Sequence, residues 1–178
     1  MNDSKINIIS YRFRLLFQCL LFLAPLFVCL NWSNFDFWLQ FANVDPEPFG
    51  TPIHSLTLSS RLGAILISFI PAGMWMMGLY YLIKLFKLYE RNQIFTANNV
   101  IFIKKIGCAL FAEVMARFLL EPFLSLIVTM HNPPGHRMMV VSFGTPDFAG
   151  LMFSGIVILV AWIMQEGQKL KEESEFVV

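Results

Sequence analysis

The sequence is poor in charged residues. Its 178 residues include 13 Lys and Arg and 12 Asp and Glu, so charged side chains make up 14% of the chain and the formal net charge is +1. A soluble domain usually carries about 25% charged residues. The scarcity of charge therefore disfavours a soluble domain, and the balance of signs disfavours direct binding of nucleic acid.

Cysteine is also scarce, and the common catalytic and metal-binding motifs are missing. Cys19, Cys29 and Cys108 all lie in apolar runs, and an odd number of cysteines in such runs disfavours both a disulfide framework and a zinc site. The sequence contains no phosphate-binding glycine loop, no HExxH pair and no nucleophile elbow. We therefore expect a protein that is not an enzyme, with no catalytic residues, no cofactor and no metal.

Apolar side chains are abundant. Hydrophobic residues make up 57% of the chain, with 19 Phe and 10 Met, and the mean hydropathy is +0.63. A bilayer core of about 30 Å requires about 20 helical residues. Four apolar stretches approach this length, at about residues 15–30, 62–83, 106–130 and 148–164.

These stretches predict an all-α integral membrane protein with four transmembrane helices in one domain, residues 1–178. The first stretch is short, but no small-x-small cleavage signal follows it, so we interpret it as a retained span and not as a signal peptide. Residues 165–178 are charged and are expected to continue the fourth helix as a cytoplasmic tail.

Basic residues predict the orientation of the spans. With both termini in the cytoplasm, ten Lys and Arg lie inside, two lie outside, and Arg117 lies within a span. The inner ten are Lys5, Arg12, Arg14, Lys84, Lys87, Arg91, Lys104, Lys105, Lys169 and Lys171; the outer two are Arg61 and Arg137. Cytoplasmic loops carry such an excess, so we expect a multi-pass protein with both termini inside.

The segment between the second and third spans is expected to form a helical cytoplasmic hairpin. Its helices project beyond the membrane and meet in a tight turn near 91–96, with Thr96 as an N-cap. Its basic residues are Lys84, Lys87, Arg91, Lys104 and Lys105. These cations either contact lipid headgroups or form a docking surface for a cytoplasmic partner, and the sequence leaves both interpretations open.

The outer loops are expected to form a small cap. Residues 31–61 are rich in Trp and Phe, as in an aromatic belt at the membrane interface. Residues 53–58 and 138–143 each have the pattern of a short strand. Because both would lie on the same side of the membrane, the two strands could pair.

The third span carries a stripe of charge. Glu113, Arg117 and Glu121 are spaced i, i+4 and i+8, which places them on one helix face. An isolated charge in the centre of a bilayer costs about 2.5–3.5 kcal/mol, so we expect Arg117 to pair with one or both carboxylates. Pro122 also leaves the carbonyl of Phe118 without its helical donor. The stripe is either a buried ion cluster that sets helix register or a site for a proton, an ion or a polar ligand.

Two further features have simpler interpretations. Small residues on the second span (Ala64, Ser68, Ala72) and on the fourth (Gly150, Ser154) are expected to allow close helix packing. The histidines at 131 and 136 flank a Pro-Pro-Gly turn, and only Asp147 lies near them as a further metal ligand, so we interpret them as solvated.

Several motifs occur in a characteristic order beyond about Thr57. They are Pro71 in the second span, a leucine-rich run over 79–85, Tyr89, the IFTANN turn at 94–99, the NPPG turn at 132–135 and the ending EGxxLxEExxFV from 166. In this order the chain resembles the bacterial membrane-protein family catalogued as domain of unknown function 2975. The resemblance implies a four-span protein of the bacterial inner membrane. Some relatives are encoded beside a small helix-turn-helix regulator, and no catalytic or ligand-binding residues are established for the family.

The sequence leaves two classes of function open. The first is a non-enzymatic interaction or regulatory membrane protein, whose partners are the lipid bilayer and a cytoplasmic protein such as a small helix-turn-helix regulator. The second is a small transporter or ligand-binding membrane protein that uses the Glu113, Arg117 and Glu121 stripe. Assembly with further copies of the chain is left open.

Overall fold

The computed structural model is built of helices and describes residues 3–33, 35–42, 44–93 and 96–175. Its elements are α1 (Asp3–Asn31), α2 (Asp36–Phe41), η1 (Pro48–Gly50), η2 (Ile53–Ser55), α3 (Leu58–Tyr89), α4 (Ala97–Thr129) and α5 (Thr145–Glu175). The all-α prediction is confirmed. Within the described residues no strand occurs.

The four long helices extend past the apolar runs that predicted them. α1 begins 12 residues before the predicted span at 15–30, and α5 continues through the charged segment after 164. The apolar run marks only the part of a helix that suits lipid, whereas the backbone hydrogen bonds continue until a capping residue or a proline ends them. At the start of α3, for example, the Thr57 side chain accepts a hydrogen bond from the Ser60 amide.

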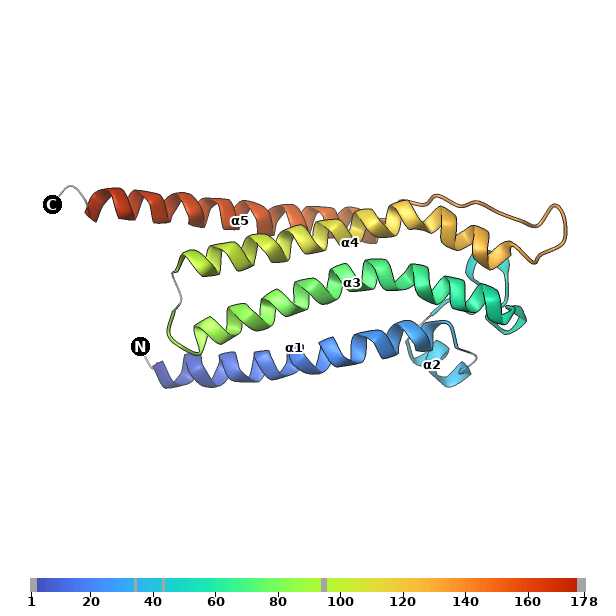
Figure 1. Ribbon diagram of the computed structural model, residues 1–178, viewed down its shortest axis with the longest axis horizontal. Helices are drawn as coiled ribbons and strands as arrows, with labels where there is room; N and C mark the ends of the chain where they lie inside the picture. The colour runs from blue at the N-terminus through green and yellow to red at the C-terminus, as the bar shows by residue number, and fades with distance from the viewer. Residues whose placement is uncertain (1–2, 34, 43, 94–95, 176–178) are drawn as a thin grey trace.

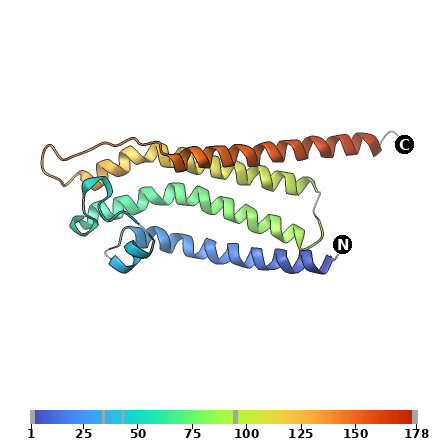
Figure 2. The same ribbon diagram turned by 180° about the vertical axis from the view of Figure 1, so that it is seen from behind.

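The long helices lie side by side in one row. α1 packs on α3, α3 on α4, and α4 on α5, and Figures 1 and 2 show this order from both sides. Neighbouring helices run antiparallel. The described ends of the chain and the α3–α4 turn therefore lie at one end of the molecule, called here the terminal end (Figure 1). The opposite end, called the loop end, carries α2, η1, η2 and the segment between α4 and α5.

Three of the described helices are long and apolar enough to cross a membrane: Asn7–Asn31, Leu58–Tyr89 and Thr145–Leu170. α4, whose apolar part contains Glu113, Arg117 and Glu121, is not among them. The length and apolar character of these three helices indicate an integral membrane protein.

The helices do not end at one level. Trp32, just after α1, donates a hydrogen bond from Nε1 to Ser68 Oγ at 3.0 Å, so α1 ends level with a point about a third of the way along α3. Asp147, in the first turn of α5, contacts Arg117 near the middle of α4. At the loop end, α3 and α4 therefore continue past α1 and α5, as Figure 1 shows.

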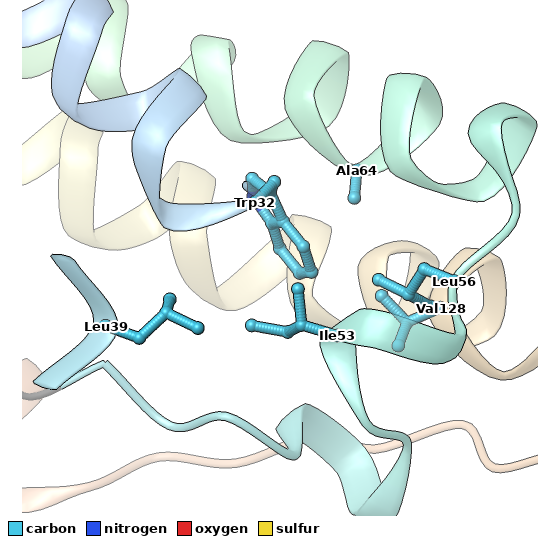
Figure 3. Close-up of a cluster of buried hydrophobic side chains, with 6 residues drawn as sticks. All are labelled: Trp32, Leu39, Ile53, Leu56, Ala64 and Val128. Carbon is cyan, nitrogen blue, oxygen red and sulfur yellow. The ribbon is translucent and has the colours of Figure 1, made fainter. Parts of the chain in front are cut away.

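The loops at the loop end cover this extension of α3 and α4. Figure 3 shows Trp32, Leu39, Ile53, Leu56, Ala64 and Val128 packed together. Ile53, Ala64 and Val128 are almost completely buried. The small core joins the loop after α1 to α3 and α4, and it holds the cap on the extension.

The predicted pair of short strands is wrong. Residues 53–55 form η2, in which the Ser55 amide donates to the Pro52 carbonyl at 3.0 Å. Residues 138–143 form neither a helix nor a strand. Every second backbone amide of residues 138–142 nevertheless donates a hydrogen bond.

Residues 138–142 lie along α4 and bond to its side chains. The Met138 amide donates to Thr129 Oγ1 at 3.1 Å, and the Val140 amide donates to Ser125 Oγ at 2.9 Å. The Ser142 amide donates to Glu121 Oε2 at 2.9 Å. Every second amide thus meets a polar side chain on the next turn of the helix. The side chains of a helix therefore supply the hydrogen-bond acceptors that a second strand was predicted to supply.

Candidate functional site

The candidate site is built around Arg117, near the middle of α4. Its Nη2 lies 2.8 Å from Asp147 Oδ1, and its Nε lies 3.8 Å from Glu113 Oε1. The Arg117 side chain is 47% exposed, whereas Asp147 and Glu113 are 16% and 21% exposed. The guanidinium thus lies in an opening of the protein, with a more enclosed carboxylate on either side.

The closest partner of Arg117 is a residue that the sequence interpretation did not assign to the stripe. Asp147 had been considered only as a metal ligand near the loop histidines. Its Oδ2 also accepts the Gly144 amide at 2.9 Å, which orders the first turn of α5 as the carboxylate of a capping box does. An acidic residue at the start of the fourth apolar run was the available signal, but sequence spacing cannot show which helix it faces.

Glu121 has a different role from the other members of the stripe. Its carboxylate accepts hydrogen bonds from both the amide and the hydroxyl of Ser142. The structure therefore joins Glu113 to Arg117, as expected for one of the two carboxylates, and uses Glu121 to hold the segment before α5 against α4.

A cavity of about 360 Å³ opens beside these groups. Its polar lining residues are Ser68, Arg117, Glu121, Ser142 and Asp147. Its apolar lining residues include Phe49, Ile67, Pro71, Phe118 and Leu124. The cavity therefore combines apolar walls with a few convergent polar groups, which is the usual character of a small-molecule site.

A second cavity, of about 320 Å³, lies on the α1 side. It is lined by residues of α1, among them Phe27 and Asn31, and by Trp75 and Glu113. Pro71 and Arg117 line both cavities. Arg117 thus stands where the two spaces adjoin.

Two helix prolines add polar groups near the first cavity. Pro71 lies inside α3 and Pro122 lies inside α4. Because proline has no amide hydrogen, the carbonyls one turn earlier, at Ile67 and Phe118, lack their helical donor. Both of these residues line the cavity.

The basic residues of the predicted hairpin lie at the terminal end. Lys84 Nζ is 4.5 Å from the centroid of the Tyr80 ring, and Lys105 Nζ is 5.2 Å from that of Tyr81. The remaining three, Lys87, Arg91 and Lys104, are exposed. Thr96 precedes α4 as expected, but its side chain makes no capping hydrogen bond.

The loop histidines and the other potential ligands do not gather. His131 Nδ1 lies 2.9 Å from Ser60 Oγ. Among the described residues, no group of three or more His, Cys, Asp or Glu is placed to hold a metal ion. The chemistry available at the site is therefore that of charge, hydrogen bonds and apolar contact.

Comparison with known proteins identifies a family. A family profile described as a protein of unknown function, DUF2975, matches residues 15–178. No curated protein and no solved structure matches the chain. The match covers most of the chain, so the chain belongs to the DUF2975 family.

Proposed function

We propose that this protein is a four-span membrane protein that binds a small ligand in the cavity beside Arg117. The observation that carries the proposal is the lining of that cavity, in which three charged side chains meet an otherwise largely apolar wall. A cavity with apolar walls and a few convergent polar groups is the usual form of a small-molecule site.

The ends of α1 and α5 support a position for the bilayer. Irregular backbone does not lie in hydrocarbon, where its amides and carbonyls would lack partners. α1 ends at Asn31 and α5 begins at Thr145, and both ends lie near the level of Pro71 and Arg117. The boundary of the bilayer then lies at this level, and the Arg117 site lies at that boundary instead of at the bilayer centre.

This position supports counting α4 as the fourth span. Between the terminal end and Arg117, α4 is flanked by α3 and α5, and Lys105 lies over the Tyr81 ring. Long basic side chains near a helix end reach the interface in this way. The excess of Lys and Arg at the terminal end supports cytoplasmic termini, and the family resemblance supports a bacterial inner membrane.

A thermal-shift screen in lipid nanodiscs tests the binding function. We expect some small molecules to raise the melting temperature of the wild-type protein but not that of Ile67→Trp or Leu120→Trp, which fill the cavity. Leu66→Trp is the matched control, because Leu66 is 70% exposed on the same helix. If no compound distinguishes the filled variants from Leu66→Trp, the protein is not a ligand-binding protein at this site.

A second candidate function is docking of a cytoplasmic protein on the α3–α4 turn. The exposed cations Lys87, Arg91 and Lys104 favour it, since such a surface suits an acidic partner. A pull-down in mild detergent with these three residues changed to Gln tests this role. Unchanged partner recovery would exclude the basic surface as the docking site.

A further inference from the structure

The charge and the acceptors of the cavity indicate which ligand it takes. We infer that the site beside Arg117 selects a small organic cation, an ammonium group on an apolar body. This inference rests on the proposed binding function and adds the chemical class of the ligand.

Arg117 is not available as an anion-binding group. Its guanidinium already contacts Asp147 at 2.8 Å and Glu113 at 3.8 Å. An anionic ligand would have to displace a carboxylate that is held at the same time by the Gly144 amide. Arg117, the one cation among the described residues that line the cavity, is therefore neutralised by the protein itself.

The remaining charge around the cavity is negative. Among the described residues that line the cavity, one is a cation, Arg117, and two carry carboxylates, Asp147 and Glu121. The bonds from Ser142 to Glu121 come from neutral donors, so they leave its charge uncompensated. A cationic ligand restores the balance, and an anion increases the imbalance.

The hydrogen-bonding groups of the wall point to the same class. Pro71 and Pro122 leave the carbonyls of Ile67 and Phe118 without helical donors, and both residues line the cavity. Carbonyls and carboxylates are acceptors only, and an ammonium group is a donor only. The carboxylate residues Asp147 and Glu121 line the cavity, so it presents acceptors that an ammonium ligand requires.

The apolar part of the wall suits the rest of such a ligand. Phe49 and Phe118 line the cavity together with Ile67 and Leu124. Aromatic faces attract organic cations, and the aliphatic side chains cover an apolar body. The site therefore selects the ammonium group of a ligand by charge and the apolar body of that ligand by apolar contact.

The test uses three probes of one shape and different charge: 2-phenylethylammonium, 2-phenylethanol and 3-phenylpropionate. Their binding to the full chain is measured by equilibrium dialysis in nanodiscs of zwitterionic lipid, so that the bilayer adds no net charge. We expect saturable binding of the ammonium compound, at least tenfold tighter than that of the carboxylate. Ile67→Trp and Leu120→Trp should abolish the binding, and Leu66→Trp should not.

The removal of one charge then tests whether the preference for the ammonium compound comes from the cavity. Glu121→Gln keeps an acceptor for Ser142 but removes a negative charge, so it should reduce the preference for the ammonium compound severalfold. Glu166→Gln is the control, because Glu166 is exposed in α5 and pairs with Lys169. Equal or tighter binding of the carboxylate at the same cavity would overturn the cation inference and leave the binding function standing. Saturable binding of none of the probes would overturn the inference, and the screen above would decide separately whether the cavity binds anything.

Discussion

At the scale of single residues, the surroundings of Arg117 determine what its charge contributes. Its partners come from two helices, Glu113 from its own and Asp147 from α5. An ion pair that is half exposed contributes less to folding than a fully buried one. The pair nevertheless joins the start of α5 to α4 and forms one wall of the cavity.

The first prediction concerns this cluster. Arg117→Leu leaves Glu113 and Asp147 without their cation, so we expect a loss of about 1–3 kcal/mol in unfolding free energy, less than for a fully buried pair. The triple variant Glu113→Gln, Arg117→Met, Asp147→Asn removes all three charges and should be more stable than Arg117→Leu. The measurement is thermal and denaturant unfolding in detergent.

A second triple variant tests whether Arg117 is coupled to Asp147, as in the structure, or to Glu121, as the sequence spacing allowed. It carries Glu113→Gln, Arg117→Met and Glu121→Gln, and it leaves Asp147 charged without Arg117. This variant should be less stable than the triple variant that neutralises Asp147. The reverse order would mean that Glu121, and not Asp147, is the second carboxylate coupled to Arg117.

At the scale of elements, the contact between α4 and α5 depends on small residues. A Cβ at Gly107 would lie 2.6 Å from Ile158 Cγ1 and 3.1 Å from the Ile158 amide nitrogen. A Cβ at Gly150 would lie 2.8 Å from Val114 Cγ2. Ser154, also predicted as a packing residue, is fully buried. The close approach of the two helices brings Asp147 within reach of Arg117.

The second prediction tests this approach. Gly107→Ala should push α5 away from α4 and lower the unfolding free energy by about 1–3 kcal/mol, since added volume at a backbone contact cannot be absorbed by a rotamer change. Gly155→Ala, on α5 with nothing within 4 Å of its added Cβ, should be neutral or slightly stabilising because alanine favours helix. Equal stability of the two variants would contradict the close α4–α5 contact.

The third prediction concerns the extended segment that lies along α4. Thr129→Val removes the acceptor of the Met138 amide, and Ser125→Ala removes that of the Val140 amide. Each variant should lose about 1–3 kcal/mol, and each should speed hydrogen exchange most at its own amide. Exchange at both amides that is unchanged in both variants would show that the segment does not depend on these side chains.

At the scale of the whole molecule, the four long helices share a slab at the terminal end, and only α3 and α4 continue beyond it. The extension from Pro71 to Leu58 corresponds to about 20 Å of helix at 1.5 Å per residue. The aromatic loop after α1 covers part of it, with Trp32 and Ile53 buried. In the orientation proposed above, this arrangement makes the proposed ligand site reachable from the outer side of the membrane.

The fourth prediction tests the placement of the bilayer and the orientation. In a cysteine-free background, Leu66→Cys should react in intact cells with a membrane-impermeant maleimide, because it lies on the extension. Met77→Cys, which lies on the same helix within the slab, should not react. Both side chains are exposed in the structure, at 70% and 46%, so the bilayer alone accounts for the difference.

Reporter fusions complete this test. Reporters placed after Glu90 or at the C-terminus should behave as cytoplasmic, and those after Glu47 or Gly135 as external. Protection of Leu66→Cys would place the extension within the bilayer. An external C-terminal reporter would show that one of the four helices does not cross.

The sequence alone determined the all-α class, the approximate positions of the long helices and the family. These properties are local, because the run of apolar residues, the helix period and the order of motifs are all read along the chain. The close packing at Gly150 and Ser154 was also predicted and is confirmed. The sequence likewise indicated that Arg117 requires a carboxylate and that Glu113, Glu121 or both could supply it.

The tertiary structure decided which residues meet across helices. Asp147 reaches Arg117 because α5 begins level with the middle of α4, and that offset depends on the contacts at Gly107 and Gly150. Residues 138–142 bond to α4 instead of to a second strand, because the acceptors on successive helix turns match every second amide of an extended chain. Register between helices arises from side chains that are distant in sequence, so no pattern along one segment contains it.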